Sequence, residues 1–236
     1  PPPSRQDREE RTERLPMTKE DRISFLRLFG GGLLIVTVTY VFLTIMRDLR
    51  DNYMANMWKE LGHGNDYAIF TSTETKTSLI ILVLISLMVL VRRNMRAFRL
   101  IHAVIVAGFL IAGISSWLFL HGQLSGPLWM QLSGLGLYLG YIPFNCIFFE
   151  RLIAAFRVKG NVGFLIYIAD AFGYLGSVAV MLSKAFFDLK VKWTSFYSEA
   201  VVWMAVLGLL GTVVSFIYFN KKYTKTESSW ENPLPS

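Results

Sequence analysis

Residues 162–182 read VGFLIYIADAFGYLGSVAVML, and this stretch decides the class of the fold. It contains one charged side chain, Asp170, and its other residues are uncharged and mostly apolar. An apolar run of about 20 residues is the length that an α-helix needs to cross the hydrocarbon core of a bilayer. The stretch therefore predicts a transmembrane helix that carries a carboxylate near its middle.

Five further apolar runs of similar length predict five more crossings. These runs are 29–46, 72–91, 100–120, 126–149 and 200–219. Hydrophobic residues make up 53% of the 236-residue chain, and charged residues make up 17%, against about 25% in a typical soluble domain. The strands of a membrane β-barrel are about half as long and alternate in polarity. We therefore predict an all-α, multi-pass membrane protein with six transmembrane helices and the lipid bilayer as its surroundings.

Lys and Arg residues are distributed unevenly between the two sides that six crossings define. Seventeen of the 24 lie on the side of the termini and seven on the opposite side. Because loops rich in Lys and Arg stay in the cytoplasm, we predict two cytoplasmic termini and a location in the cytoplasmic (inner) membrane. The chain then divides into a cytoplasmic linker (1–22), a six-helix transmembrane domain (23–222) and a cytoplasmic C-terminal tail (223–236). The same distribution explains the net charge of +7 without nucleic acid as a partner.

Asp170 requires a protein or aqueous neighbour, because an aspartate at the centre of a membrane helix costs about 2.5–3.5 kcal/mol on insertion scales. At helical spacing, three other polar residues lie on the same arc as Asp170. They are Tyr167, Tyr174 and Ser177. Gly173 and Gly176 lie beside this arc and predict close packing against another helix. We interpret the polar stripe as a candidate substrate or proton site. The other interpretation is a structural hydrogen bond from Asp170 to a Tyr, Ser or Asn on a neighbouring helix.

The run at 126–149 contains a second polar position, next to a helix breaker. Pro143 removes a backbone donor and predicts a kink, and Asn145 follows it closely. The Asn145 amide is expected either to bond to carbonyls freed by the kink or to face a cavity, and the second expectation adds it to the candidate site. Gly136 and Gly140 form a GxxxG pair, which also predicts a close helix contact.

A cluster of charges follows the first run and is predicted to lie at its outer end. Its members are Arg47, Asp48, Arg50 and Asp51. Arg47 and Asp51 are four residues apart, so we expect them to pair on one face of a helix that continues to Gly62. One interpretation is an interfacial anchor, since a charged side chain costs little free energy where an apolar run ends. The other is a gate or a mouth that attracts substrate.

The sequence contains no pattern typical of a catalytic or metal site. It has one cysteine, Cys146, and its three histidines are far apart, at 63, 102 and 121. This spacing does not match metal-ligand patterns, and no Ser/His pair or close pair of carboxylates is evident. We expect no metal, no cofactor and no enzymatic activity.

Three stretches resemble a known family: RDLRDNY (47–53), LYLGYIPFNCIFFERLIAAFR (137–157) and NVGFLIYIADAFGYLGSV (161–178). They look like an uncharacterised bacterial family, a domain of unknown function described as similar to the major facilitator superfamily. The likeness extends over nearly the whole chain. It implies a C-terminal six-helix half, whose partner is the N-terminal six-helix half of the same protein outside this chain. Residues 1–22 would then belong to the loop between the halves.

Two functional hypotheses follow from this resemblance. The first is half of a facilitator-like secondary transporter that moves an unknown small solute, with proton coupling through Asp170. The second is a non-transporting membrane scaffold or sensor with a facilitator-like fold. The loop VRRNMRAF (91–98) favours the second, because it has the arginines of the superfamily's loop signature and lacks its Gly and Asp.

Overall fold

The computed structural model of the chain describes residues 17–158, 160–187 and 192–231. Six helical segments in these ranges are long and apolar enough to cross a membrane. They are α2 (Lys19–Glu60), α3 (Tyr67–Val89), α4 (Asn94–Leu120), the continuous α5–η1–α6 (Gly126–Pro143, Phe144–Phe148 and Phe149–Phe156), α7 (Val162–Phe187) and α8 (Trp193–Glu231). The described ranges contain no strand. The prediction of an all-α chain with six helices long and apolar enough to cross a membrane is confirmed.

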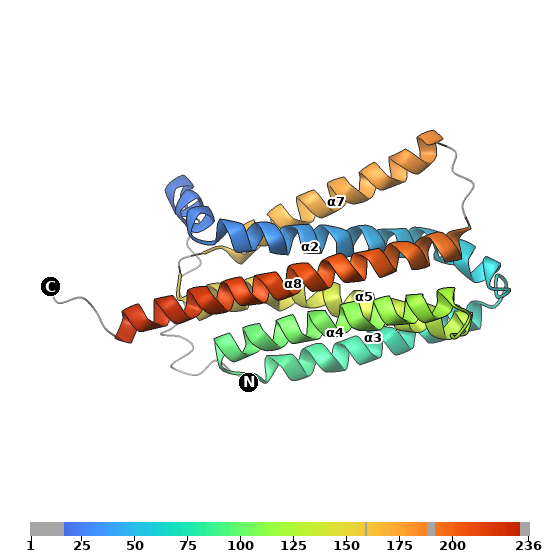
Figure 1. Cartoon of the computed structure of the whole chain (residues 1–236), viewed down its shortest axis with the longest axis horizontal. Coiled ribbons are helices and arrows are strands. Elements are labelled where there is room, and N and C mark those ends of the chain that lie inside the picture. Colours follow the sequence, from blue (N-terminus) through green and yellow to red (C-terminus); the bar gives the residue numbers. More distant parts are fainter. Residues whose placement is uncertain (1–16, 159, 188–191, 232–236) are drawn as a thin grey trace.

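Helices α2 and α4 make most of the contacts between helices in the bundle. Helix α2 packs against α8, α7 and α5, while α4 packs against α5 and α8, and α3 packs mainly against α5. Figure 1 shows α7 on the outside of α2, diverging from the other helices along its length. Helix α2 begins and α8 ends at the same end of the bundle (Figure 1). The opposite end, which contains Arg50 and the α2–α3 connection, is called the Arg50 end below.

Glycines permit the closest helix contacts, as their spacing predicts. A Cβ atom added at Gly136 would lie 2.5 Å from the Gly108 carbonyl oxygen and 2.5 Å from the Ala112 amide nitrogen, so α4 and α5 are in backbone contact. On α7, added Cβ atoms at Gly173 and Gly176 would meet α2 side chains at 2.9 Å. The predicted GxxxG contact and the predicted small-residue seam are both confirmed.

Helical structure crosses both predicted domain boundaries. Helix α2 begins inside the predicted linker, where Thr18 and Asp21 form a capping box: each side chain accepts a hydrogen bond from the other residue's backbone N–H. Helix α8 continues into the predicted tail as far as Glu231. Residues 1–16 and 232–236 lie outside the described ranges. The division into linker, transmembrane domain and tail stays a prediction.

A carboxylate from α2 caps the start of α8 at the Arg50 end. The two Glu60 oxygens accept hydrogen bonds from the backbone N–H groups of Trp193 and Thr194 and from the Thr194 hydroxyl, each at 2.8 Å. The first N–H groups of a helix have no partner within the helix, so this cap satisfies two of them. The stacked rings of Tyr53 and Trp193, with centroids 3.6 Å apart, support the same junction.

Replacing Glu60 by Ala is expected to weaken the first turn of α8 by about 1 kcal/mol, the usual cost of losing a helix cap. Hydrogen exchange at the Trp193 and Thr194 amides should then become roughly fivefold faster. Lys59→Ala is the control, because Lys59 is exposed and belongs to the same turn of α2. Equal exchange rates in the two variants would show that Glu60 does not stabilise this turn.

Candidate functional site

The Asp170 carboxylate joins a polar network between three helical elements. It accepts a hydrogen bond from the hydroxyl of Tyr40 on α2. The Tyr40 hydroxyl lies 3.2 Å from that of Tyr141 on α5, and the two rings stack with centroids 5.3 Å apart. The Asn145 amide donates to the Tyr141 hydroxyl at 2.9 Å and to the Tyr40 hydroxyl at 3.2 Å. Asp170 itself is half-buried, whereas both tyrosines are buried.

Asn145 reaches this network from an irregular turn of its helix. The α-helical hydrogen bonding of α5 ends at Pro143, and residues 144–148 form a π-helical turn before α6 continues the helix. Proline lacks the backbone N–H that the regular ladder requires, and a single π-helical turn is a common adjustment, often at functional sites. This π-helical turn lies where the sequence predicted a kink. The Asn145 amide donates to two tyrosine hydroxyls rather than to freed carbonyls, which was the first of the two expectations.

The other predicted members of the α7 stripe lie at different depths. Tyr167 and Tyr174 are exposed, at 76% and 50% of their surface. Ser177 is buried, and no partner for its hydroxyl is found among the described residues. The structure therefore connects Asp170 and Asn145 directly and leaves the two α7 tyrosines as an open aromatic surface next to Asp170.

Tyr40 and Tyr141 are the members of this network that the sequence analysis did not name. Each lies within an apolar run, and a buried tyrosine hydroxyl usually requires a hydrogen-bond partner. That signal was available, because a Tyr, Ser or Asn partner for Asp170 was expected. Several tyrosines met this description, however, and only the packing of α2 against α7 selects Tyr40.

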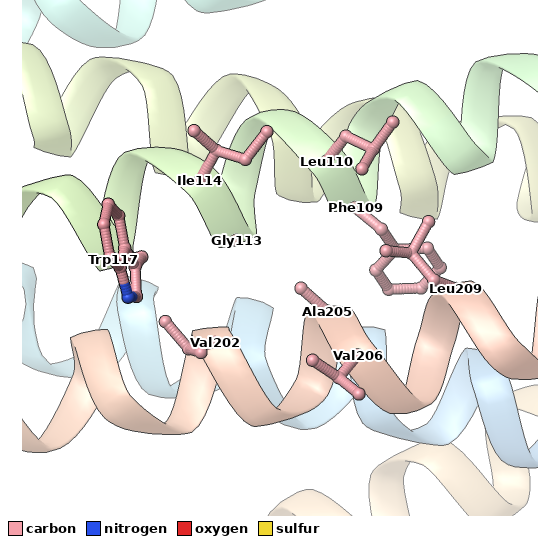
Figure 2. A pocket seen from close by; sticks show the side chains of 9 residues that line it. All are labelled: Phe109, Leu110, Gly113, Ile114, Trp117, Val202, Ala205, Val206 and Leu209. Carbon is pink, nitrogen blue, oxygen red and sulfur yellow. The ribbon is translucent and has the colours of Figure 1, made fainter.

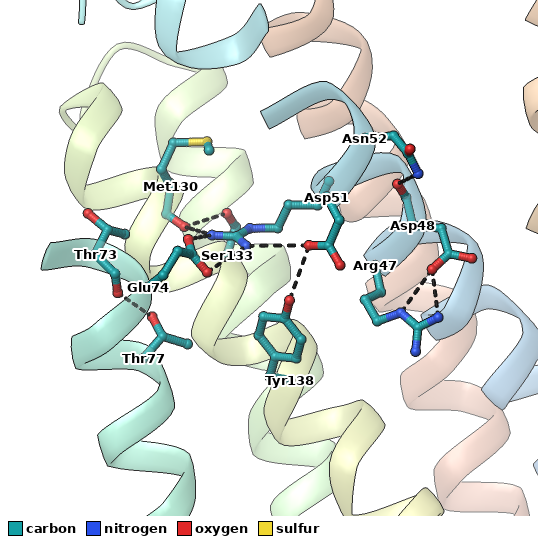
Figure 3. Close-up of polar contacts among 11 residues, drawn as sticks. Arg47, Asp48, Asp51, Asn52, Thr73, Glu74, Thr77, Met130, Ser133 and Tyr138 are labelled. Atoms are coloured by element: carbon teal, nitrogen blue, oxygen red, sulfur yellow. Dashed lines mark hydrogen bonds and ion pairs between the residues drawn. The ribbon is translucent and has the colours of Figure 1, made fainter. Parts of the chain in front are cut away.

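Arg47 extends the polar region from this network toward the Arg50 end. Its guanidinium carbon lies 4.4 Å from the Tyr141 ring centroid, in a cation–π arrangement, and beside the Tyr174 hydroxyl. Two of its nitrogens donate to one oxygen of Asp48, at 2.9 and 2.6 Å. Figure 3 shows this pair, in which Asp48 balances the charge of Arg47.

The predicted pair between Arg47 and Asp51 is wrong. Arg47 bonds to Asp48, while Asp51 accepts a hydrogen bond from the Tyr138 hydroxyl at 3.1 Å and lies 4.0 Å from an Arg50 nitrogen. The prediction considered only neighbours on one helix. In the bundle, α5 provides Tyr138 as a partner for Asp51 (Figure 3).

Arg50 is a charged side chain buried within the bundle. Its side chain has no exposed surface, and its two terminal nitrogens donate to the two oxygens of Glu74 on α3, at 3.1 and 2.6 Å. One of them also donates to the Met130 carbonyl at 3.3 Å. Gly134 provides the space, because a Cβ atom there would lie 2.6 Å from this guanidinium. Glu74 lies within the predicted run 72–91, and the sequence pattern does not identify it as the partner of Arg50.

An apolar groove between α4 and α8 is separate from these polar groups. Its volume is about 220 Å³, and Figure 2 shows Phe109 and Trp117 of α4 extending toward α8, which contributes Val202 and Val206 to the lining. None of the residues that line it carries a charge. The groove therefore offers surface for apolar groups and adds nothing to the Asp170 network.

One comparison with known proteins identifies the family. The model described as "Family of unknown function (DUF5690)" matches residues 1–222. The chain belongs to this family. The match extends over nearly the whole chain and confirms the expectation of an uncharacterised family, while the relationship to the major facilitator superfamily stays a prediction. No curated protein and no solved structure matches the chain.

Metal-binding groups are not gathered in the described part of this DUF5690 chain. Its described His, Cys, Asp and Glu residues form no cluster of three or more that could hold a metal ion. Cys146 is a free thiol in the π-helical turn. The chemistry available at Asp170 is therefore that of a carboxylate, hydroxyls, an amide and aromatic rings.

Proposed function

We propose that this chain is the C-terminal six-helix half of a facilitator-like secondary transporter, in the inner membrane with both termini in the cytoplasm. Asp170 carries the proposal: a carboxylate deep in an apolar helix, hydrogen-bonded to Tyr40 and open on one side. An ionisable side chain this deep in a membrane helix costs free energy, and such residues usually mark a substrate or proton pathway. A second six-helix half packed over α7 would enclose Asp170 in a cavity at the interface between the halves, where facilitators bind their solutes.

The hydrogen-bond geometry supports a role for Asp170 in proton movement. Asn145 donates to Tyr141, and the Tyr141 hydroxyl is 3.2 Å from that of Tyr40, which donates to Asp170. When a proton binds the carboxylate, Asp170 becomes the donor and Tyr40 the acceptor in the hydrogen bond between them. The tyrosine hydroxyls can rotate to accommodate this reversal, because a hydroxyl is both a donor and an acceptor. Asp170 is then the group that binds and releases the proton during transport.

Asp170→Asn is expected to separate proton movement from solute movement. In liposomes with the full-length protein and an internal pH-sensitive dye, gradients of sugars, amino acids, organic acids and organic amines would be imposed in turn. With a transported solute, proton flux should fall about tenfold or more, equivalent to about 1.4 kcal/mol. Exchange of labelled for unlabelled solute should continue, because exchange requires no net proton transfer.

Asp66→Asn is the matched control for this experiment. Asp66 caps α3 by accepting from the Ile69 N–H at 3.1 Å, and Asn is an equally good capping residue. Proton flux in this variant should match the wild type. If Asp170→Asn and Asp66→Asn both leave proton flux unchanged at every pH, Asp170 is not the coupling residue.

A membrane scaffold or sensor with the same fold is the second candidate. The loop after α3 favours it, because residues 91–98 lack the Gly and Asp of the facilitator signature. A protein of this kind would be purified with a stable partner, and none of the solutes would raise its melting temperature or drive proton flux.

A further inference from the structure

We propose that the solute bound at Asp170 is an organic cation, held by the carboxylate and by the exposed rings of Tyr167 and Tyr174. This inference rests on the proposed function and names the class of solute for that same site. It follows from three features: the charge balance around Asp170, the aromatic surface on α7, and the number of oxygen ligands within reach.

The negative charge of Asp170 is not balanced by a basic side chain in the described part of the chain. Arg47 and Arg50 form ion pairs with Asp48, Asp51 and Glu74. The nearest of these arginines, Arg47, is already neutralised by Asp48. Asp170 receives one hydrogen bond, from an uncharged tyrosine, and its second oxygen receives none from the described residues. A half-buried charge is favoured by such compensation, so a positively charged ligand would suit this carboxylate.

The charges between Asp170 and the Arg50 end also favour a cation. Arg47 and Arg50 carry two positive charges, and Asp48, Asp51 and Glu74 carry three negative ones. Of these carboxylates, Asp51 is the most open, with 46% of its side chain exposed. This group of five side chains carries one net negative charge, and negative charge near a site raises the local concentration of cations and lowers that of anions.

The aromatic surface beside Asp170 suits an organic cation. Tyr167 is three residues before Asp170 and Tyr174 is four after it, so both flank the carboxylate on one face of α7. The two residues are exposed at 76% and 50% of their surface. An ammonium or phosphonium group near a carboxylate can be covered by such rings through cation–π attraction.

An inorganic metal ion fits this site poorly. Calcium takes about six to eight oxygen ligands and magnesium about six. The Asp170 network contains one carboxylate, and the described residues form no cluster of three or more acidic, His or Cys side chains. A large cation of low charge density requires fewer oxygens and gains from the apolar surface.

Two ions of nearly the same shape and opposite charge test this inference. Radiolabelled tetraphenylphosphonium and tetraphenylborate would be bound to the full-length protein in nanodiscs, with affinity measured by a proximity assay. Only the phosphonium should bind saturably. Its affinity should fall about 30-fold in Asp170→Asn, in which the charge partner is lost, and it should be retained in Asp170→Glu, which keeps the charge. Both variants should elute as wild type in size-exclusion chromatography.

Tyr167 gives a second, independent measurement of the same site. Tyr167→Leu removes the ring and should weaken phosphonium binding roughly fivefold, whereas Tyr167→Phe keeps the ring and should bind like the wild type. A role of Tyr167 in folding alone would not distinguish Phe from Leu in this way.

Three results would overturn the organic-cation assignment: equal affinity for the two ions, an unchanged phosphonium affinity in Asp170→Asn, or no phosphonium binding by the wild type. If the last result comes from a protein that still shows solute-driven proton flux dependent on Asp170, the proposed transporter stands without a cationic solute. Phosphonium binding at Asp170 without any flux would keep the cation site and overturn transport.

Discussion

Replacing Glu74 by Gln is expected to lower the free energy of unfolding by about 3 kcal/mol, the lower end of the cost of breaking a buried ion pair, because Arg50 is fully buried while Glu74 is 31% exposed. Arg50 has no exposed side-chain surface, and both of its bonds to a full negative charge go to Glu74. After the substitution, its positive charge is left with a neutral amide, the Met130 carbonyl and the Asp51 carboxylate, which lies 4.0 Å away. The cost arises from the loss of the close charged partner of a fully buried guanidinium rather than from the loss of one hydrogen bond.

Unfolding of the purified protein in mixed detergent and dodecyl sulfate, followed by circular dichroism, would measure this effect. The double variant Arg50→Met with Glu74→Met should recover most of the lost stability, since replacing both partners with apolar groups leaves no charge to compensate. Glu20→Gln is the control for the change from carboxylate to amide. Glu20 is exposed in the first turn of α2 and should contribute less than about 1 kcal/mol. A loss no larger in Glu74→Gln than in Glu20→Gln would refute the assignment of a buried, essential pair.

Gly136→Ala is expected to destabilise the bundle by about 2–3 kcal/mol, at the upper end of the cost of overpacking. The added methyl group would lie 2.5 Å from two backbone atoms of α4, the Gly108 oxygen and the Ala112 nitrogen. A flexible side chain could rotate away from such a contact, but helical backbone cannot. The two helices must therefore separate, and the packing along the α4–α5 interface is lost with them.

Gly30→Ala is the matched control, because an added Cβ atom at Gly30 would have nothing within 4 Å. This variant should remain within about 1 kcal/mol of the wild type, and any change should be a gain, since Ala favours a helix over Gly. Melting of both variants in the same detergent gives the comparison. If Gly136→Ala and Gly30→Ala melted at the same temperature, the close contact of α4 and α5 would not contribute to stability.

The features predicted correctly from the sequence are those that depend on one helix at a time. The apolar runs determine the six crossings, because the length of a run and the thickness of the bilayer set them without reference to neighbours. The break after Pro143 has the same local origin, since proline lacks a backbone donor. The packing of Gly173 and Gly176 was also predicted, because small residues on one face of a helix mark a contact whatever the partner is.

The features that the sequence did not predict are the partners across helices. Arg47 and Asp51 had the spacing of an ion pair, yet Asp48 and Tyr138 take their places. Glu74 is 24 residues from Arg50 and was not recognised as its partner, because only the packing of α2, α3 and α5 brings the two groups together.

The sequence by itself determined that this is an all-α membrane chain with a carboxylate deep inside one helix. Only the tertiary structure decided that the carboxylate bonds to Tyr40, that Asn145 joins it through Tyr141, and that Tyr167 and Tyr174 stay open beside it. The physical reason is that hydrophobic length and helical periodicity act along one segment, whereas a hydrogen-bond partner depends on which faces of two helices meet. That choice is made by side-chain packing over the whole bundle.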